Sequence, residues 1–546
     1  MFKTPLLQKM AKLMQDAHLL NQNPELTLDQ INERRLLLKS TLAGSLLLLP
    51  VSGFLNACAH LSTDTGDRVP NARPNFKSNL NEDPVVILGA GIAGLTAAYE
   101  LAKAGRQSVI YEASPRLGGR MFTKTNFNSE RMTCELGGEL VDTGHEDLIG
   151  LCKELNVELD DFATEDKGLE QNLYYFGGHY YTDKDLVIAF QPFAKRLQRD
   201  QKKAFPDAAP KGTITTYARQ LDQLTLDDYL HKFTDVEKWV VDLIRIAYIG
   251  EMALDSNVQS ATSMITTLVA DTSQGFKLYG ESDQAKRIRG GNISLIEALH
   301  KNLEASGVTI HCGFPLVSIK YLSTGLRLDF GDSSAFSVVA KKVICTLPFS
   351  TLREVHGLQE LPMNPLKKKC IANTSYGTAA KMMLGYQSRP WRSGIKKGSF
   401  KIPASNGMVY TQLDVQNIWE SSRNQPGNSG ILSCYVGGSM GANLNLNQTA
   451  AFRKHVDEVF PEVDQIFDQN RAHFNWTRFT FGRGSYASAK AGETYIYGDV
   501  AGRSELSGQL HFAGEHTAGI YAGFMNGACR SGKLVAQAIL KQKVAV

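Results

Sequence analysis

Residues 84–120 carry the clearest pattern of apolar and polar positions in the chain. Four consecutive apolar residues, Val85 to Leu88, predict a short buried strand. The Ala- and Leu-rich stretch from Ile92 to Ala104 predicts a helix, which Gly105 ends. A second run, Ser108 to Tyr111, predicts the next strand. This order is typical of a strand–helix–strand unit in a parallel sheet.

Three glycines between the first strand and the helix have the spacing G-x-G-x-x-G. Gly89 permits the tight turn, Gly91 lets a pyrophosphate approach the backbone, and Gly94 lets the helix pack on the strand. The N–H groups at the start of the helix would face the phosphates. Glu112 follows Gly94 by 18 residues, near the spacing of about 20 expected for a carboxylate that binds a ribose hydroxyl. The segment predicts a dinucleotide site but does not separate NAD from FAD.

From about residue 150 to 285 the apolar positions take helical spacing. Helices are expected over Leu148 to Leu155, around Lys195 to Lys203 and over Val236 to Ile249.

Strand patterns return after residue 285. The segment RIRGG, residues 287–291, introduces a helix over Ile293 to Ala305. Strands are expected over Val308 to His311 and Leu316 to Tyr321, and a hairpin from Leu326 to Phe330 and Ser337 to Leu347. Residues 350–480 mix both patterns.

The C-terminal stretch predicts a strand at Leu510 to Phe512, a loop of small residues, and an amphipathic helix from about Gly523 to Lys541. Small residues permit close backbone approach, and the helix N-terminus is a second site for partial negative charge.

The N-terminal region differs from the rest. Residues 33–39 read ERRLLLK and precede an apolar run from Thr41 to Leu55, which is short for a membrane-spanning helix. The pattern resembles a twin-arginine export signal, although Glu33 stands where Ser or Thr is usual. Residues 60–83 are polar and predict a linker.

Three forms of the mature N-terminus are open. Residues 55–58 resemble a lipoprotein box, in which Cys58 would carry a lipid anchor. Residues 57–59 also offer an A-x-A cleavage site, and the third form is an uncleaved membrane anchor. We expect export to the periplasm, free or lipid-anchored on the outside of the cytoplasmic membrane.

Composition excludes several classes of function. The 546 residues are 43% apolar and 21% charged, as in soluble globular proteins of two or three domains. A net charge of +4 is small for this length and does not indicate a nucleic-acid partner. The eight cysteines form neither a C-x-x-C motif nor a cluster with histidine, so no metal site is expected.

Two further motifs resemble the flavin monoamine oxidase family, which includes monoamine oxidases, polyamine oxidases and L-amino-acid oxidases. Gly118, Gly119 and Arg120 resemble the Gly-Gly-Arg segment of these proteins, where the glycines admit the cofactor and the arginine suits its pyrophosphate. Residues 512–517, FAGEHT, meet the family pattern F-A-G-E-x-T. The resemblance covers roughly residues 84–546 and implies FAD.

The implied fold is α/β, with a discontinuous Rossmann-like FAD-binding domain and a mixed α+β substrate-binding domain that has a helical part. The expected boundaries are 1–59 for the leader, 60–83 for the linker, 84–150, 285–348 and 481–546 for the FAD-binding domain, 151–284 for the helical part and 349–480 for the mixed sheet.

The resemblance also implies cofactor contacts. Gly514 and Glu515 would lie at the flavin's ribityl chain, and Met525 would offer its backbone N–H to the pyrimidine edge. Val317 would hold the adenine through its backbone. Residues 135–142, ELGGELVD, resemble an element beside the flavin.

Three residues are implied in the chemistry. Lys381, in SYGTAAKMMLGYQSRPW, matches a lysine that holds a water next to flavin N5. Tyr486 and Phe524 match two aromatic walls that orient an amine, although tyrosine is commoner at the second wall and Tyr521 is close by. Relatives with covalent flavin have cysteine where this chain has Ser485, so FAD is expected to be non-covalent.

The implied reaction oxidises a primary or secondary amine to an imine, which hydrolyses to an aldehyde, while O2 becomes H2O2. L-Amino-acid oxidases need a cation for the substrate carboxylate, often an arginine after the element aligned with residues 135–142. This chain has Leu140, Val141 and Asp142 there, which favours a simple amine.

Two alternative substrates remain beside the simple amine. Glu139 and Asp142 favour a basic or polyamine-like substrate, and an L-amino-acid oxidase with a differently placed arginine is the nearest rival. A third alternative, from a different class of function, is an exported FAD-binding protein without turnover. Carotenoid-desaturase-like or porphyrinogen-oxidase-like activity is less favoured, because Lys381 and the aromatic pair indicate amines.

Overall fold

The strand–helix–strand unit predicted after the linker is present. The computed structural model describes residues 83–541 except 208, 211–212, 271–277, 280–281, 332–335, 398–399 and 498, so the predicted leader and Cys58 lie outside the described residues. The unit consists of β1 (Val85–Leu88), α3 (Ile92–Lys103) and β2 (Ser108–Glu112).

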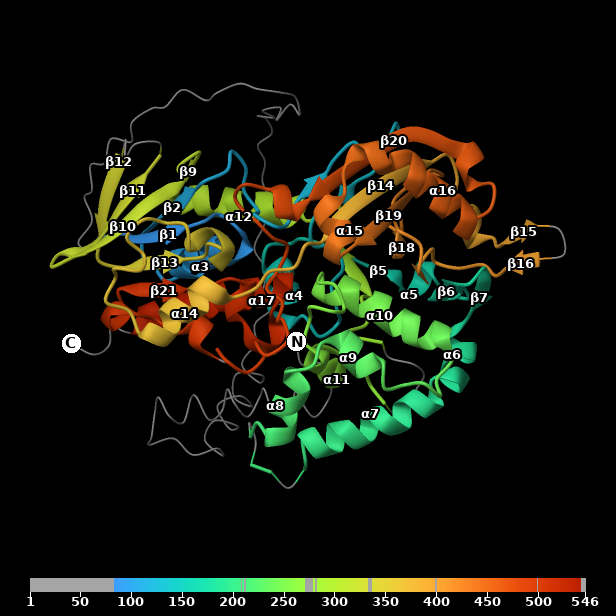
Figure 1. The fold of residues 1–546 in the computed structure, drawn as a ribbon. Helices are drawn as coiled ribbons and strands as arrows, with labels where there is room; N and C mark the ends of the chain where they lie inside the picture. The colour runs from blue at the N-terminus through green and yellow to red at the C-terminus, as the bar shows by residue number, and fades with distance from the viewer. Residues whose placement is uncertain are drawn as a thin grey trace, which may run out of the picture. The chain divides into compact units, whose positions relative to one another are not determined.

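A five-stranded parallel sheet is assembled from three distant segments, in the order β21-β13-β1-β2-β9 (Figure 1). Its other strands are β9 (Thr309–Cys312), β13 (Val343–Cys345) and β21 (Leu510–Phe512). This discontinuous sheet confirms the Rossmann-like fold. The residue boundaries of the domains stay predictions.

Helices cover this sheet through close backbone contacts. α17 (Met525–Lys541) and α12 (Ile293–Ala305) both pack on α3, and α17 also packs on α4 (Glu146–Glu154). A Cβ on Gly532 of α17 would lie 2.2 Å from the carbonyl oxygen of Ala93, so the two helices touch at the backbone.

The predicted hairpin is correct in its first part and wrong in its last. β10 (Leu316–Leu322), β11 (Gly325–Phe330) and β12 (Phe336–Ala340) form an antiparallel sheet. The expected strand from Ser337 to Leu347 instead divides at Lys341 and Lys342, because its second half, β13, pairs with β1 in the parallel sheet.

A seven-stranded sheet forms the second part of the molecule, in the order β20-β14-β19-β18-β17-β6-β7. Its strands are β6 (Leu173–Phe176), β7 (His179–Tyr181), β14 (Ala380–Tyr386), β17 (Val409–Thr411), β18 (Asn417–Glu420), β19 (Gly430–Val436) and β20 (Phe467–Asn475). Two of these strands come from the stretch predicted to be mainly helical.

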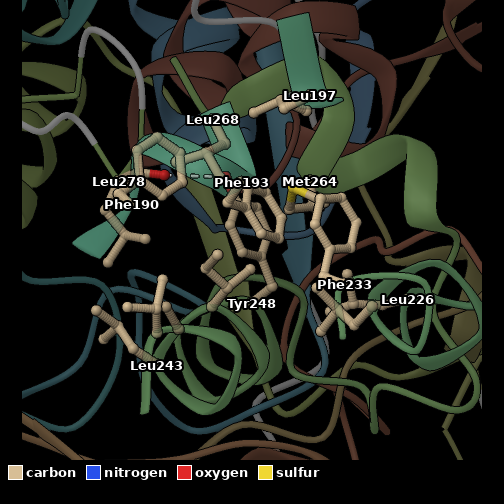
Figure 2. Close-up of a cluster of buried hydrophobic side chains, with 14 of the residues drawn as sticks. Phe190, Phe193, Leu197, Leu226, Phe233, Leu243, Tyr248, Met264, Leu268 and Leu278 are labelled. Carbon is tan, nitrogen blue, oxygen red and sulfur yellow. Dashed lines mark hydrogen bonds between the residues drawn. The ribbon is translucent and has the colours of Figure 1, made fainter. Parts of the chain in front are cut away.

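Helices of the middle segment pack beside this sheet, and α10 (Lys238–Met252) contacts β6, β17, β18 and β19 (Figure 1). Figure 2 shows Phe190, Phe193, Phe233 and Tyr248 lying together among leucines and Met264, in an extensive buried apolar cluster. The other helices here are α5 (Phe162–Glu165), α6 (Asp183–Ala189), α7 (Gln191–Ala204), α8 (Thr216–Asp222), α9 (Leu226–Leu230) and α11 (Ala261–Thr267).

Shorter elements complete the described fold. The helices are α13 (Phe349–Leu352), α14 (Pro365–Asn373), α15 (Gly438–Asn443) and α16 (Thr449–Val459). The paired strands are β3 (Thr123–Lys124) with β4 (Cys134–Glu135), β5 (Leu159–Asp161) with β8 (Lys286–Ile288), and β15 (Ile395–Lys397) with β16 (Phe400–Ile402).

None of the helices in the described part of the chain is both long and apolar enough to cross a membrane. Across the described ranges, no three His, Cys, Asp or Glu side chains are grouped as a metal site would require.

Candidate active site

A cavity of about 330 Å³ runs from the edge of the parallel sheet to the seven-stranded sheet. At one end it is lined by the glycine-rich turn after β1, by Glu112 at the end of β2, and by the Gly-Gly-Arg segment. At the other end it is lined by side chains of β14, β17, β18 and β19.

The glycines of the first end make a cradle. Gly89 has a φ of +100°, and a Cβ on Gly94 would lie 2.1 Å from the Gly89 carbonyl oxygen, so α3 packs directly on the turn. Gly91 and Gly119 face one another, since a Cβ on Gly119 would lie 3.1 Å from the Gly91 Cα. Gly94 is not among the residues that line the cavity, and its part is to seat the helix.

The carboxylate of Glu112 is fixed beside this cradle. Its oxygens accept hydrogen bonds from the backbone N–H of Ala90 at 2.7 Å and of Ser114 at 2.8 Å. The side chain is buried and lines the cavity, where the fingerprint places a ribose hydroxyl.

Arg120 and Glu515 connect two segments that are far apart in the sequence. Arg120 Nη1 donates to Glu515 Oε1 at 2.6 Å and to the carbonyl oxygen of Ser485 at 2.8 Å. Glu515 also accepts from the backbone N–H of Ala487 and Gly523. Burial alone would raise the pKa of Glu515, but Arg120 holds it below its ordinary value. Both residues line the cavity, and Gly514 lies beside them.

The N-terminal end of α17 reaches the same cavity through Phe524, Met525 and Ala528. The first N–H groups of a helix have no partner within it, so this end offers donors and a positive dipole. A Cβ on Gly138 would lie 2.9 Å from Met525 Sδ, which packs the 135–142 element against this helix.

These features fit FAD. Glycine turns and helix N-termini suit a pyrophosphate, and the paired carboxylate and backbone donors beyond them suit the sugar chain of a flavin. Val317 is not among the residues that line this cavity, and its carbonyl oxygen accepts from the His356 N–H at 3.0 Å. The adenine contact assigned to Val317 stays a prediction.

Lys381 is buried in β14 at the other end and forms an ion pair. Its Nζ lies 2.8 Å from Glu139 Oε2, donates to the Glu135 carbonyl oxygen at 3.0 Å, and stands 4.9 Å from the ring centre of Trp419. Glu139 also accepts from Trp419 Nε1 at 3.0 Å and Ser421 Oγ at 2.7 Å. Burial opposes ionisation, but Lys381 lowers the pKa of Glu139 from its ordinary value.

One row of side chains crosses the seven-stranded sheet from Lys381. Lys381 pairs with Tyr435, Tyr435 with Asn417, and Asn417 with Tyr410 on successive antiparallel strands. Directly paired residues present their side chains on the same face, and all four line the cavity. This row therefore forms one wall of the cavity.

Tyr486 and Phe524 both line the cavity, as the resemblance implies. The Tyr486 hydroxyl lies 2.6 Å from that of Tyr435 and donates to the Gly250 carbonyl oxygen at 2.8 Å. Phe524 lies against His145, with ring centres 5.2 Å apart. Tyr521 is absent from the lining residues. The catalytic roles of Lys381, Tyr486 and Phe524 stay predictions.

Of the two acidic residues considered for a basic substrate, Glu139 lines the cavity. The carboxylate of Glu139 is bound to Lys381. Asp142 does not line the cavity and accepts from Ser282 Oγ and the Gln284 N–H, with His145 Nε2 at 3.1 Å.

Many lining residues were not singled out from the sequence, among them Glu251, Asn417, Trp419 and Tyr435. The alternation of β18 and β19 shows which residues share a face, but not that these strands lie beside Lys381. Strand pairing between distant segments supplies that information.

The fold and the cavity together define a flavin-dependent oxidoreductase. The chain belongs to the flavin-containing amine oxidoreductase family, whose model matches residues 92–540.

Among curated relatives, it is 22% identical to an L-amino-acid oxidase of Naja atra over 86% of this chain and 90% of the relative. It is 24% identical to a flavin-containing amine oxidase of Oncorhynchus mykiss over 84% and 86%, and 23% identical to a nicotine dehydrogenase of Pseudomonas putida over 85% and 89%.

Two solved structures share the fold. Cyclohexylamine oxidase from Brevibacterium oxydans matches with a TM-score of 0.69 and 20% identity, and putrescine oxidase bound to putrescine with 0.67 and 20%. Each covers 84% of this chain, and the chain covers 99% of each.

Proposed function

We propose that this FAD-dependent amine oxidase acts on a primary or secondary amine that carries no adjacent carboxylate, with O2 as the acceptor. One observation carries the proposal. Among the described lining residues the cationic side chains are Arg120 and Lys381, which pair with Glu515 and Glu139. A substrate carboxylate would meet no cation there that is not already paired.

The chain's own residues would orient the amine and exclude water. The aromatic faces of Tyr486, Phe524 and Trp419 suit an amine, because their ring faces are electron-rich. Buried walls keep water from the reacting carbon, and Glu139 holds the Lys381 ammonium in one place. FAD, when bound, accepts two electrons from the substrate C–N unit. The amine and O2 then yield the imine and H2O2, and the imine hydrolyses.

A panel of substrates tests this proposal. Purified holoenzyme should produce peroxide with alkyl or aryl amines and little with L-amino acids, and the same amines should bleach the flavin without oxygen. Preference for an L-amino acid would overturn the substrate assignment. Bleaching without peroxide would replace O2 by another acceptor. No bleaching with any amine would favour a binding protein without turnover.

We also propose that the protein is exported, on the strength of Arg34, Arg35 and the apolar run after them. Mass spectrometry of the protein from its host should find a new N-terminus near residues 58–60, with or without lipid on Cys58. An intact N-terminus at Met1 would contradict cleavage and export.

A further inference from the structure

A second, smaller chamber adjoins the wall of the cavity, and the proposed mechanism does not use it. Its volume is about 10 Å³, close to the least that holds one water molecule. The side chains that line it include Glu135, Glu139, Arg287 and Asn292. Glu139 lines both spaces, whereas Glu135 lines the chamber and not the cavity. Glu139 therefore stands between the two spaces, and we call the smaller one the Glu135 chamber.

The carboxylate of Glu135 is fixed against the N-terminal end of α12. Its Oε1 accepts from the backbone N–H of Asn292 at 2.7 Å and from Thr123 Oγ1 at 2.8 Å. Its Oε2 accepts from Asn292 Nδ2 at 3.2 Å. A carboxylate oxygen accepts two hydrogen bonds, so Oε2 has room for one more donor.

The carboxylate of Glu139 also has room for a further donor. Its Oε2 accepts from Lys381 Nζ and Trp419 Nε1, and its Oε1 accepts from Ser421 Oγ at 2.7 Å. Lys381 lowers the pKa of Glu139 and keeps this carboxylate ionised at neutral pH. Glu139 is therefore suited to pass a proton on, but not to keep it.

The lining of the Glu135 chamber suits a water molecule. A buried water makes two to four hydrogen bonds, and a polar space large enough for one does not stay dry. Glu135 and Glu139 supply acceptors, and Arg287 supplies donors. Arg287 uses Nε for Asp160 and Nη1 for the Ser421 carbonyl oxygen. The guanidinium in the wall disfavours a metal cation, so a neutral molecule fits best.

Glu135 is able to exchange a proton near neutral pH. Burial raises its pKa to about 7, and the charge of Glu139 adds to the increase, against the effect of Lys381 and of the hydrogen-bond donors. The other titratable groups at the chamber keep one charge state. Burial raises the pKa of the Cys134 thiol, and the arginine side chain of Arg287 stays charged. A group whose pKa lies near the working pH takes up and returns protons most effectively.

Amine oxidation by O2 needs a temporary place for one proton. A protonated amine, RCH2NH3+, and O2 give RCH=NH2+ and H2O2, with no net gain or loss of protons. In the first half, two electrons and one proton leave with the C–H bond to bound FAD, and a second proton leaves the nitrogen. This second proton is needed again when O2 becomes H2O2, so it must be held in between.

We propose that the Glu135 chamber binds one water molecule that joins Glu139 to Glu135, and that Glu135 stores the amine's proton between the two halves of the reaction. The proton passes from the substrate nitrogen to Glu139 in the cavity wall, and through the water to Glu135. It returns by the same path when H2O2 forms, so both carboxylates regain their starting state. The inference rests on the proposed amine oxidation and adds a proton store to it.

A high-resolution crystal structure of the holoenzyme tests the water. One density peak should lie in the Glu135 chamber, within about 2.6–3.2 Å of an oxygen of Glu135 and an oxygen of Glu139. The absence of a peak overturns the relay. A peak with the ligand number and short contacts of a metal ion overturns it as well.

Glu135→Gln separates proton storage from hydrogen bonding, because the amide keeps the shape and an acceptor oxygen but takes no proton. In the wild type, anaerobic bleaching by an amine should produce a protonated-carboxyl band in the infrared difference spectrum, and the bleaching rate should change with an inflection near pH 7. Glu135→Gln should lose the band and the inflection, and should bleach about a hundredfold more slowly. Glu297→Gln, an exposed change on α12, is the matched control and should behave as the wild type.

The outcomes separate this inference from the proposed function. If amines bleach the flavin and Glu135→Gln keeps the wild-type band and pH profile, the proton store alone is overturned. Absence of bleaching with every amine overturns the proposed function, and the crystal structure still tests the water. If Glu135→Gln does not fold, the wild-type infrared band and the density in the chamber decide.

Discussion

At the scale of single residues, the ion pair between Lys381 and Glu139 is the part of the site most sensitive to substitution, because each partner is a buried charge. Both side chains are at most 5% exposed, so each charge depends on the other. Because Lys381 lowers the pKa of Glu139, this pair stabilises the fold at neutral pH, and its contribution is lost only as the pH falls through the lowered pKa.

Removing either partner of this ion pair should lower the stability of the fold. Lys381→Met and Glu139→Gln should each lower the free energy of unfolding by about 3–5 kcal/mol, because each leaves a buried charge unpaired. The double variant should recover part of the loss, and Lys381→Met should also slow flavin reduction or reoxidation. Denaturant unfolding and stopped-flow absorbance measure these, with the exposed Lys301→Met as control. Additive losses in the double variant would show that the two residues do not act as a pair.

His516 gives a prediction for acid stability. Burial lowers its pKa from 6.5 to about 4, and neither ring nitrogen has a hydrogen-bond partner among the described residues. The unfolded chain therefore binds more protons than the folded one between those values. The contribution of His516 to the free energy of unfolding should be complete above about pH 6.5. It should decrease by about 3 kcal/mol as the pH drops to about 4, at about 1.4 kcal/mol per pKa unit.

His516→Leu should make thermal stability less dependent on pH across this range, whatever it does to the melting temperature at pH 7. His511, with its pKa also lowered to about 4, would contribute a dependence of the same sign. The exposed His231→Asn should follow the wild-type profile, and an unchanged slope in His516→Leu would refute the assignment.

At the scale of elements, local patterns and strand pairing carried different information. Val85–Leu88, Ile293–Ala305 and Leu510–Phe512 were predictable because apolar runs and helical spacing are local properties of the chain. The break between β12 and β13 and the row from Lys381 to Tyr410 were not, because they depend on which distant strands become neighbours. The glycine cradle was predictable because its spacing is local.

The seating of α3 on the glycine turn can be tested directly. Gly94→Ala places a methyl group 2.1 Å from a carbonyl oxygen and should cost about 1–3 kcal/mol or more, with loss of bound FAD. Gly150→Ala, in the exposed part of α4 where no atom lies within 4 Å, should be neutral or slightly stabilising. Flavin absorbance and thermal unfolding measure both, and equal behaviour of the two variants would contradict the role of Gly94.

At the scale of the whole molecule, the mode of cofactor attachment follows from Ser485. Its hydroxyl lines the cavity and accepts from the Ala379 N–H at 3.2 Å, and a hydroxyl forms no thioether. Acid precipitation should therefore release all the yellow flavin into the supernatant. Flavin that stays with the washed protein pellet would show a covalent link elsewhere, and Ser485→Cys provides the comparison.

The order of strands in the parallel sheet also determines when this sheet can be completed during synthesis of the chain. β1 is made early, but its neighbour β13 and the edge strand β21 are near the middle and end of the chain. At about 5–20 residues per second, β21 leaves the ribosome on the order of a minute after β1. Until then neither Glu515 nor α17 exists to complete the cofactor cradle. The nascent protein must therefore wait, with an incomplete sheet and exposed apolar edges, for its last residues before it can take up FAD.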